Sequence, residues 1–387
     1  MTSVPSSSMP DTPRTRRGRV GLFWARITEG LALEQLWGQF LSEAKASYGL
    51  YSREVDWNQV HRQARGPGRI WLSVWALFQA MLMKLTPARR VLLLIAIAFL
   101  IVEPDVRWGK HEVSIQLAGF GSLILFLLLA LELADRVAMK RDLEIAREIQ
   151  QRLVPEVPPA VSGLDIAFAT RPQNTVAGDY YDAFLRPLPD LKPLLLIVAD
   201  VAGKSVPAAL LMATFQASLR ALSATPANLE GIVTGLDRYT RAHNMDGRRF
   251  TTAFLAEVNP QTHEMRYTNA GQNDPVLRHN SGEIERLSRG GPPFGLPLFT
   301  DGELKYESQT LVLRPADLLV IFTDGLVEAV DERGEEFGES RLLASIRSVP
   351  QERAAATLER VMNQVNAFVG LARQHDDITC MVVRVDG

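Results

Sequence analysis

The stretch NTVAGDYYDAFLRP, residues 174–187, places two aspartates in a segment that otherwise indicates a β-strand. Tyrosine and phenylalanine favour strands, whereas aspartate and glycine are depleted in them. Gly178, Asp179 and Asp182 therefore weaken the strand unless their carboxylates or backbone have another task. This conflict predicts that the carboxylates bind something.

The same context recurs along the chain. An aspartate beside a small residue or at an apolar strand boundary also occurs in LLLIVADVAGKS, LLVIFTDGL and RQHDDITCMVV, at Asp200, at Asp324 and at the pair Asp376 and Asp377. One such aspartate is usually a turn former. Strand ends of one sandwich can converge, however, and clustered carboxylates repel one another unless a divalent cation neutralises them.

These residue types predict a metal site with oxygen ligands. With no His or Cys ligand pattern nearby, Mg²⁺ or Mn²⁺ is favoured over zinc. Two such ions about 4 Å apart, bridged by a hydroxide, would supply a nucleophile and bind phosphoryl oxygens. Gly178 and Gly325 leave room for close approach. The chain shows no convincing Ser-His-Asp, Cys-His or P-loop pattern.

Six sequence blocks then carry a family resemblance over about residues 160–386. In chain order they are AGDYYD, ADVAGKSVPAALLMA, TTAFLAEVNP…YTNAGQNDPVL, GPPFGL, IFTDGLVEA…EEFGESRL and HDDIT. The chain resembles the bacterial stage-II-sporulation-E-type branch of the metal-dependent (PPM) serine/threonine protein phosphatases, relatives of the type 2C enzymes. The resemblance implies an α+β fold, a central antiparallel β-sandwich flanked by helices, with two Mn²⁺ or Mg²⁺ ions at one end.

The resemblance also implies roles for individual residues. Asp179, Asp200, Asp324 and Asp376 match metal ligands, and the carbonyl of Val201 matches a backbone ligand. The residues expected to surround and support these ligands are Gly178, Asp182, Gly325 and Asp377. The chain departs from the family pattern at Gln272, where histidine is common, and at Ser205, where a second glycine is frequent.

The function that the resemblance implies is hydrolysis of phosphoserine or phosphothreonine on a protein, typically a small anti-sigma-factor antagonist. A catalytically inactive scaffold that binds a phosphoprotein is an alternative, against which the intact carboxylates argue. A net charge of −2 argues against a general nucleic-acid binder. The single cysteine, Cys380, excludes an internal disulfide framework and fits a reducing compartment.

From residue 160 onward, many short strands surround a few helices. Strict strand–helix alternation is absent, which favours antiparallel sheets over a doubly wound parallel one. Helices are expected at about 206–223, 227–244, 339–347 and 351–370, and NPQTHE, residues 259–264, indicates a hairpin loop. We expect the catalytic domain to span residues 160–387.

The N-terminal part has a different composition. We expect a disordered basic tail over 1–20, a helical region over 21–85, and a transmembrane hairpin over 86–135 with spans at about 88–104 and 113–134. Basic residues flank the hairpin on both outer sides, which places those flanks and the catalytic domain in the cytoplasm and the protein in the inner, cytoplasmic membrane. Two buried helices of a soluble domain are the alternative.

Residues 136–158 link the two parts. A heptad stripe precedes the terminating Pro155, at Met139, Leu143, Ala146, Gln150 and Leu153. This stripe predicts a linker helix that pairs with a second copy as a coiled coil and so forms a homodimer. An amphipathic helix packed on its own domain is the alternative.

Overall fold

The structure is a computed structural model that describes residues 68–102, 105–108, 111–114, 117–189, 192–243, 249–296, 304–347 and 352–386. The expected tail 1–20 and most of the expected helical region 21–85 lie outside these residues. The chain divides into two compact units, Met1–Asp135 and Arg136–Gly387, which are described separately.

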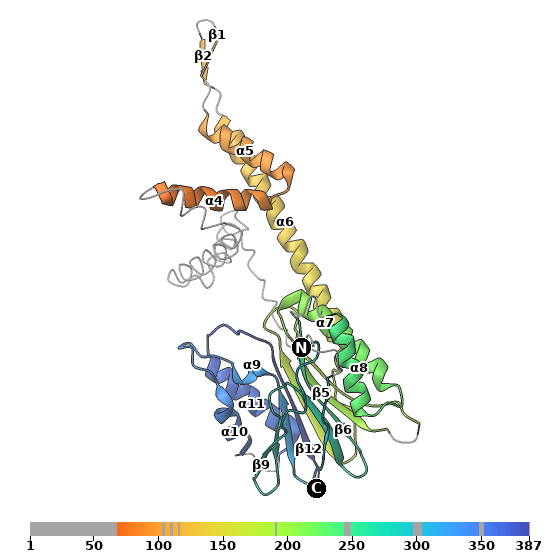
Figure 1. The fold of residues 1–387 in the computed structure, drawn as a ribbon. Helices are drawn as coiled ribbons and strands as arrows, with labels where there is room; N and C mark the ends of the chain where they lie inside the picture. The colour runs from red at the N-terminus through yellow and green to blue at the C-terminus, as the bar shows by residue number, and fades with distance from the viewer. Residues whose placement is uncertain are drawn as a thin grey trace, which may run out of the picture. The chain divides into compact units, whose positions relative to one another are not determined.

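The second unit is built on two five-stranded sheets (Figure 1). The first has the order β10-β7-β6-β5-β4, with β4 Tyr180–Leu185, β5 Leu194–Val201, β6 Thr251–Val258, β7 Glu264–Ala270 and β10 Gln309–Val312. The second has the order β3-β12-β11-β8-β9, with β3 Leu164–Arg171, β8 Val276–Arg278, β9 Ile284–Arg286, β11 Leu318–Phe322 and β12 Ile378–Val385. Neighbouring strands in both sheets pair antiparallel. The predicted α+β class is confirmed.

Helices cover the outer faces of both sheets (Figure 1). Buried side chains of α7 (Ser205–Ser223) and α8 (Leu229–Ala242) pack on the first sheet. Those of α9 (Asp324–Val327), α10 (Gly338–Arg347) and α11 (Ala354–Val369) pack on the second. A third core lies between the sheets because alternate strand residues point inward, among them Leu196, Phe254, Ile321 and Met381. The unit therefore has four layers, with two sheets in the middle and helices on both outer sides. The ends of the strands lie at the edges of these layers.

Several elements predicted from the sequence are present in this unit. Helices α7, α8, α10 and α11 lie where the apolar periodicity predicts them. The loop between β6 and β7 closes the expected hairpin, with Val258 paired to Met265. Cys380 is fully buried in β12, and burial raises the pKa of its thiol to about 12, as expected of an unreactive core cysteine.

The described part of the first unit contains α4 (Gly68–Lys84), α5 (Pro87–Ile101), a two-stranded ladder of β1 (Asp105–Trp108) with β2 (His111–Ser114), and the start of α6 (Leu117–Gln151). Helices α5 and α6 contact each other at Gly121, where an added Cβ would lie 2.8 Å from the carbonyl oxygen of Ala96. Arg89 of α5 also pairs with Asp135 of α6, with Nη1 2.7 Å from Oδ2.

The helix boundaries differ from the sequence-based ones. The expected span 113–134 begins too early, because Val113 and Ser114 pair with β1 and the helix starts at Leu117. The expected linker helix 136–158 ends earlier, at Gln151, since Pro155 cannot continue it and restricts the residue before it. The expected second span and the linker are one helix of 35 residues.

Helix α6 is, among the described residues, the one helix that is long and apolar enough to cross a bilayer, by length and composition. Helix α5 has 15 residues, whereas a span needs about 20. The transmembrane hairpin and the coiled coil remain predictions.

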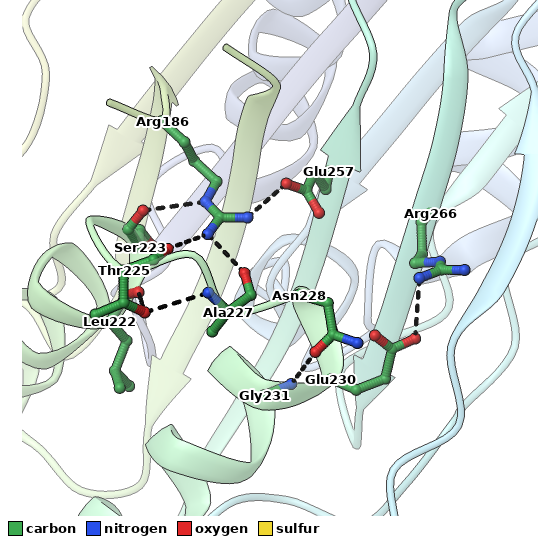
Figure 2. Close-up of polar contacts among 10 residues, drawn as sticks. All are labelled: Arg186, Leu222, Ser223, Thr225, Ala227, Asn228, Glu230, Gly231, Glu257 and Arg266. Atoms are coloured by element: carbon green, nitrogen blue, oxygen red, sulfur yellow. Dashed lines mark hydrogen bonds and ion pairs between the residues drawn. The ribbon is translucent and has the colours of Figure 1, made fainter. Parts of the chain in front are cut away.

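Arg186 fixes the connection between α7 and α8 to the first sheet (Figure 2). Its side chain is buried and donates to the carbonyl oxygens of Ser223 at 3.1 Å, Thr225 at 2.8 Å and Ala227 at 2.7 Å. It also forms an ion pair of 2.6 Å with Glu257 in β6. The buried cation thus satisfies the carbonyl group of Ser223, the last residue of α7, and those of Thr225 and Ala227 after it.

We expect Arg186→Met to lower the free energy of unfolding by about 3–5 kcal/mol, because it leaves the Glu257 carboxylate and three carbonyls without their partner. The matched control is Arg266→Met, which removes an ion pair of 3.6 Å with Glu230 (Figure 2). The Arg266 side chain is 47% exposed, so its loss should cost no more than about 1 kcal/mol. Urea unfolding measures both, and equal losses would contradict the anchoring role of Arg186.

Candidate metal centre

The four predicted ligand positions lie at the same end of the two sheets. Asp179 directly precedes β4, and Asp200 lies at the end of the neighbouring β5, whose Ala199 pairs with Tyr180. In the second sheet, Asp324 follows β11 and Asp376 precedes the neighbouring β12. The end of one antiparallel strand and the start of its neighbour share an edge. Each sheet therefore brings two aspartates together.

Hydrogen bonds join the two sheets at this end. The Thr323 hydroxyl, just after β11, donates to Oδ2 of Asp179 at 2.9 Å. The Gly178 N–H donates to Oδ2 of Asp377 at 2.7 Å, and the Gln173 N–H donates to Oδ1 of the same carboxylate at 2.6 Å. Asp179 is thus held from the second sheet, whereas Asp377 is held both by Gly178 beside the first sheet and by Gln173 in the connection that follows β3.

Two glycines allow the close packing around these carboxylates. A Cβ on Gly325 would lie 2.0 Å from the carbonyl oxygen of Asp377, a distance at which the two segments must separate. A Cβ on Gly178 would lie 3.0 Å from the carbonyl oxygen of Val201 and 3.6 Å from Oδ1 of Asp200. A side chain at Gly178 would therefore crowd the Val201 carbonyl and contact the Asp200 carboxylate.

Burial and mutual repulsion raise the pKa values of the clustered aspartates. Burial, followed by the charge of Asp200, holds the pKa of Asp179 well above its usual range. Burial raises the pKa of Asp200 to about 7, and the charges of Asp324, Asp376 and Asp377 add to it. The pKa of Asp324 is raised by burial and then by Asp376. The ionised forms of these groups are therefore unfavourable together without a compensating cation.

Lys204 is a basic side chain in contact with the cluster. It is the N-cap residue of α7, and its Nζ lies 3.4 Å from Oδ2 of Asp376 and donates to the carbonyl of His375. Both side chains of the ion pair are about half exposed, so water weakens it. One ammonium cannot balance the charges of five carboxylates, and the cluster remains acidic.

The donor set fits a hard divalent cation in its chemistry, since carboxylate and carbonyl oxygens are the ligands that Mg²⁺ and Mn²⁺ take. Within the described residues, no group of three or more His, Cys, Asp or Glu side chains is already arranged to hold an ion. In the described structure the site is a cluster of carboxylates that raise one another's pKa values.

The two aspartates of the last block have different surroundings. Both oxygens of Asp377 accept backbone N–H groups, from Gln173 and Gly178. The side chain of Asp376 is 43% exposed, and its Oδ2 faces Lys204. Asp376 is therefore the carboxylate with more freedom to reach an ion. The prediction that Asp376 is the ligand requires this freedom.

Asp182 has partners outside the cluster. It is fully buried, and its Oδ2 accepts from the Tyr180 hydroxyl at 2.7 Å and pairs with Arg220 of α7 at 2.6 Å. These contacts attach β4 to α7. They give Asp182 a structural role on the helix side of the first sheet, unlike the supporting role beside the metal ligands that the resemblance implies.

Sequence reasoning missed the threonines that hold the ligands. Besides its bond to Asp179, the Thr323 hydroxyl accepts from the Thr379 N–H at 3.0 Å. The Thr379 hydroxyl lies 2.9 Å from that of Thr170 in β3. Each of the blocks IFTDG and HDDIT does place a threonine near its aspartate. Because threonine is common in strands, this signal was not distinctive.

Comparisons with known proteins agree with this arrangement. A family model described as Stage II sporulation protein E (SpoIIE) matches residues 191–386, about half of the chain. This chain belongs to the SpoIIE family. The range matched by the family model contains Asp200, Asp324 and Asp376, whereas Asp179 lies just before that range.

Two curated proteins are similar to this member of the SpoIIE family. Phosphoserine phosphatase RsbU of Bacillus subtilis is 28% identical over 248 residues, which cover 64% of this chain and 70% of RsbU. Protein IcfG of Synechocystis is 25% identical over 314 residues, which cover 73% of this chain but only 48% of IcfG. The SiaA-PP2C domain of Pseudomonas aeruginosa is a structural neighbour at a TM-score of 0.56 and 22% identity, covering 65% of this chain and 99% of that domain. The fold is thus that of a PP2C domain.

The raised pKa of Asp200 predicts how metal-free stability depends on pH. An unfolded aspartate titrates near pH 4, whereas Asp200 in the folded protein titrates near pH 7. Between these values the folded state holds a proton that the unfolded chain has lost, so the stabilising contribution is present below pH 4 and lost as pH rises through 7. In EDTA, the Tm of wild type minus that of Asp200→Asn should therefore fall from pH 4 to pH 8. A difference that rises over this interval would contradict the assignment.

Proposed function

We propose that this chain is a metal-dependent protein serine/threonine phosphatase. The observation that carries the proposal is the convergence of aspartates from both sheets at one end of a PP2C-type fold, in a member of the SpoIIE family. The similarity to RsbU, a protein named as a phosphoserine phosphatase, supports it. The intact set of carboxylates gives no support to the alternative of an inactive scaffold.

Two Mn²⁺ or Mg²⁺ ions are the proposed cofactors. Asp179, Asp200, Asp324 and Asp376, with the carbonyl oxygen of Val201, would hold them, since all are oxygen donors at one end of the sheets. When bound, such ions supply an activated water and neutralise the charge that develops on a phosphoryl group. The excess negative charge of the cluster is what supports this assignment.

The chain's own contribution is to place the ligands and to offset part of the rise in their pKa values through hydrogen bonds to the carboxylates. The Thr323 hydroxyl donates to Asp179 and therefore favours its carboxylate over its acid form. The backbone N–H groups of Gln173 and Gly178 do the same for Asp377. Lys204, half exposed beside Asp376, could contact a phosphoryl oxygen from the solvent side. No side chain needs to act as a nucleophile in this scheme.

The proposed substrate is a phosphorylated signalling protein, in the class of anti-sigma-factor antagonists. Family membership and the similarity to RsbU support a role in sigma-factor regulation. For the cellular place, we propose the cytoplasmic membrane with the catalytic domain in the cytoplasm. The length and apolar composition of α6 support this placement.

A homodimer through the linker helix is a further part of this proposal. Of the heptad positions, Met139 is exposed, while Leu143 and Ala146 are partly exposed along α6. Apolar side chains open to solvent at this spacing support pairing with a second copy.

Asp324→Asn tests the enzymatic role, because it removes one charge from the cluster with little change in shape. We expect Mn²⁺-dependent hydrolysis of a phosphoserine peptide by the full chain to fall by at least about 100-fold, with the Tm in EDTA unchanged or higher since a repulsion is relieved. The matched control is Asp331→Asn, a turn carboxylate that accepts the N–H groups of Arg333 and Glu335. The control should keep full activity. Equal activity of the two variants would refute the assignment of Asp324.

A further inference from the structure

The last turn of α6 contacts the segment that carries Asp179. The Gln150 side chain accepts the N–H of Ala177 through Oε1 at 2.9 Å and donates from Nε2 to the carbonyl oxygen of the same residue at 2.7 Å. Ala177 is 6% exposed. One amide side chain therefore satisfies both backbone polar groups of a buried residue, in the way that a neighbouring strand would.

Ala177 begins a run of three residues that are each held by a different partner. Ala177 is held by Gln150 of α6, Gly178 donates to Asp377 of the second sheet, and Asp179 accepts from Thr323. A shift of Ala177 must move Gly178, which packs against the Val201 carbonyl. The position of α6 is thus connected to the metal-ligand cluster through two peptide units.

The end of α6 is fixed to the same domain by other contacts. Gln216 of α7 donates to the Leu153 carbonyl at 3.3 Å, and Val154 packs against the cores on both faces of the first sheet. Between the helix end and the sheets lies a cavity of about 410 Å³, whose lining includes Gln150, Gln151 and Asp179. On the side of the 177–179 segment that lines this cavity, the Gln150 side chain holds the Ala177 backbone by two hydrogen bonds.

We propose that Gln150 is a positioning residue of the phosphatase site, which sets the place of Asp179 by clamping the Ala177 backbone. The effect of Gln150 on catalysis rests on the proposed function, whereas its clamp on the Ala177 backbone does not depend on that function. Gln150 occupies a position in the heptad stripe that would otherwise favour an apolar residue. Loss of the Gln150 side chain would break the clamp and loosen the segment that carries Asp179.

The test compares Gln150→Ala with the matched control Gln151→Ala in the full chain. Gln151 is the next residue, is exposed, and lines the same cavity, but Gln150 makes the bonds to Ala177. Hydrogen–deuterium exchange of the Ala177 amide should become about tenfold faster in Gln150→Ala, because its acceptor is gone, and should not change in Gln151→Ala. The affinity for Mn²⁺, measured by calorimetry, should weaken several-fold in the first variant alone.

Gln150→Glu separates the two bonds of the clamp. Glutamate keeps an acceptor for the Ala177 N–H but cannot donate to the Ala177 carbonyl, so exchange at Ala177 should lie between wild type and Gln150→Ala. Tm values within a few degrees of wild type would show that all variants are folded. Unchanged exchange and Mn²⁺ affinity in Gln150→Ala would overturn the proposal.

The outcomes also distinguish the two proposals. Faster exchange in Gln150→Ala with weaker Mn²⁺ binding supports the positioning role, whether or not wild type hydrolyses a phosphopeptide. If wild type shows Mn²⁺-dependent hydrolysis and both glutamine variants match it in exchange, affinity and rate, the phosphatase proposal stands and the positioning role of Gln150 is wrong.

Discussion

Repulsion among carboxylates at the ends of β4, β5, β11 and β12 is the constraint on which the rest of the structure depends. Burial and proximity raise the pKa values of Asp179, Asp200 and Asp324. A fold gains nothing from such crowding by itself, since each buried charge costs solvation free energy. The proposed divalent cations would offset this repulsion, and their binding would stabilise the folded state relative to the metal-free protein.

The two sheets must keep their relative position at this end for the cluster to exist. Gln272, a departure from the family pattern, helps to hold the two sheets together. It is buried, and its Nε2 donates to the Phe322 carbonyl at 3.0 Å, which links the loop after β7 to the end of β11. Ser205, the other departure, has a φ of 62°, where glycine is favoured. The backbone at the start of α7 therefore keeps the glycine conformation, at some cost in strain.

The sequence predicted the features that have a local signature. An aspartate beside a small residue at the boundary of an apolar run identified the four aspartates that the structure brings to one end of the sheets, and apolar periodicity located α7 and α8. Prediction from the sequence failed where the partner of a residue is distant in the chain. The clamp of Gln150 on Ala177 spans 27 residues, and Gln150 was interpreted only as a heptad position. Asp182 shares its motif with Asp179. The side chains of β4 alternate between the two faces of the sheet, and the ion pair with the distant Arg220 holds Asp182 on the face that α7 covers.

Anomalous X-ray diffraction from crystals of the full chain grown with Mn²⁺ measures the central claim most directly, because it locates the ions and their ligands without reference to activity. The account predicts two manganese peaks within coordination distance of the carboxylate oxygens of Asp179, Asp200, Asp324 and Asp376. Saturating Mn²⁺ with no peak at this end of the sheets, or with peaks bound by other residues, would contradict it.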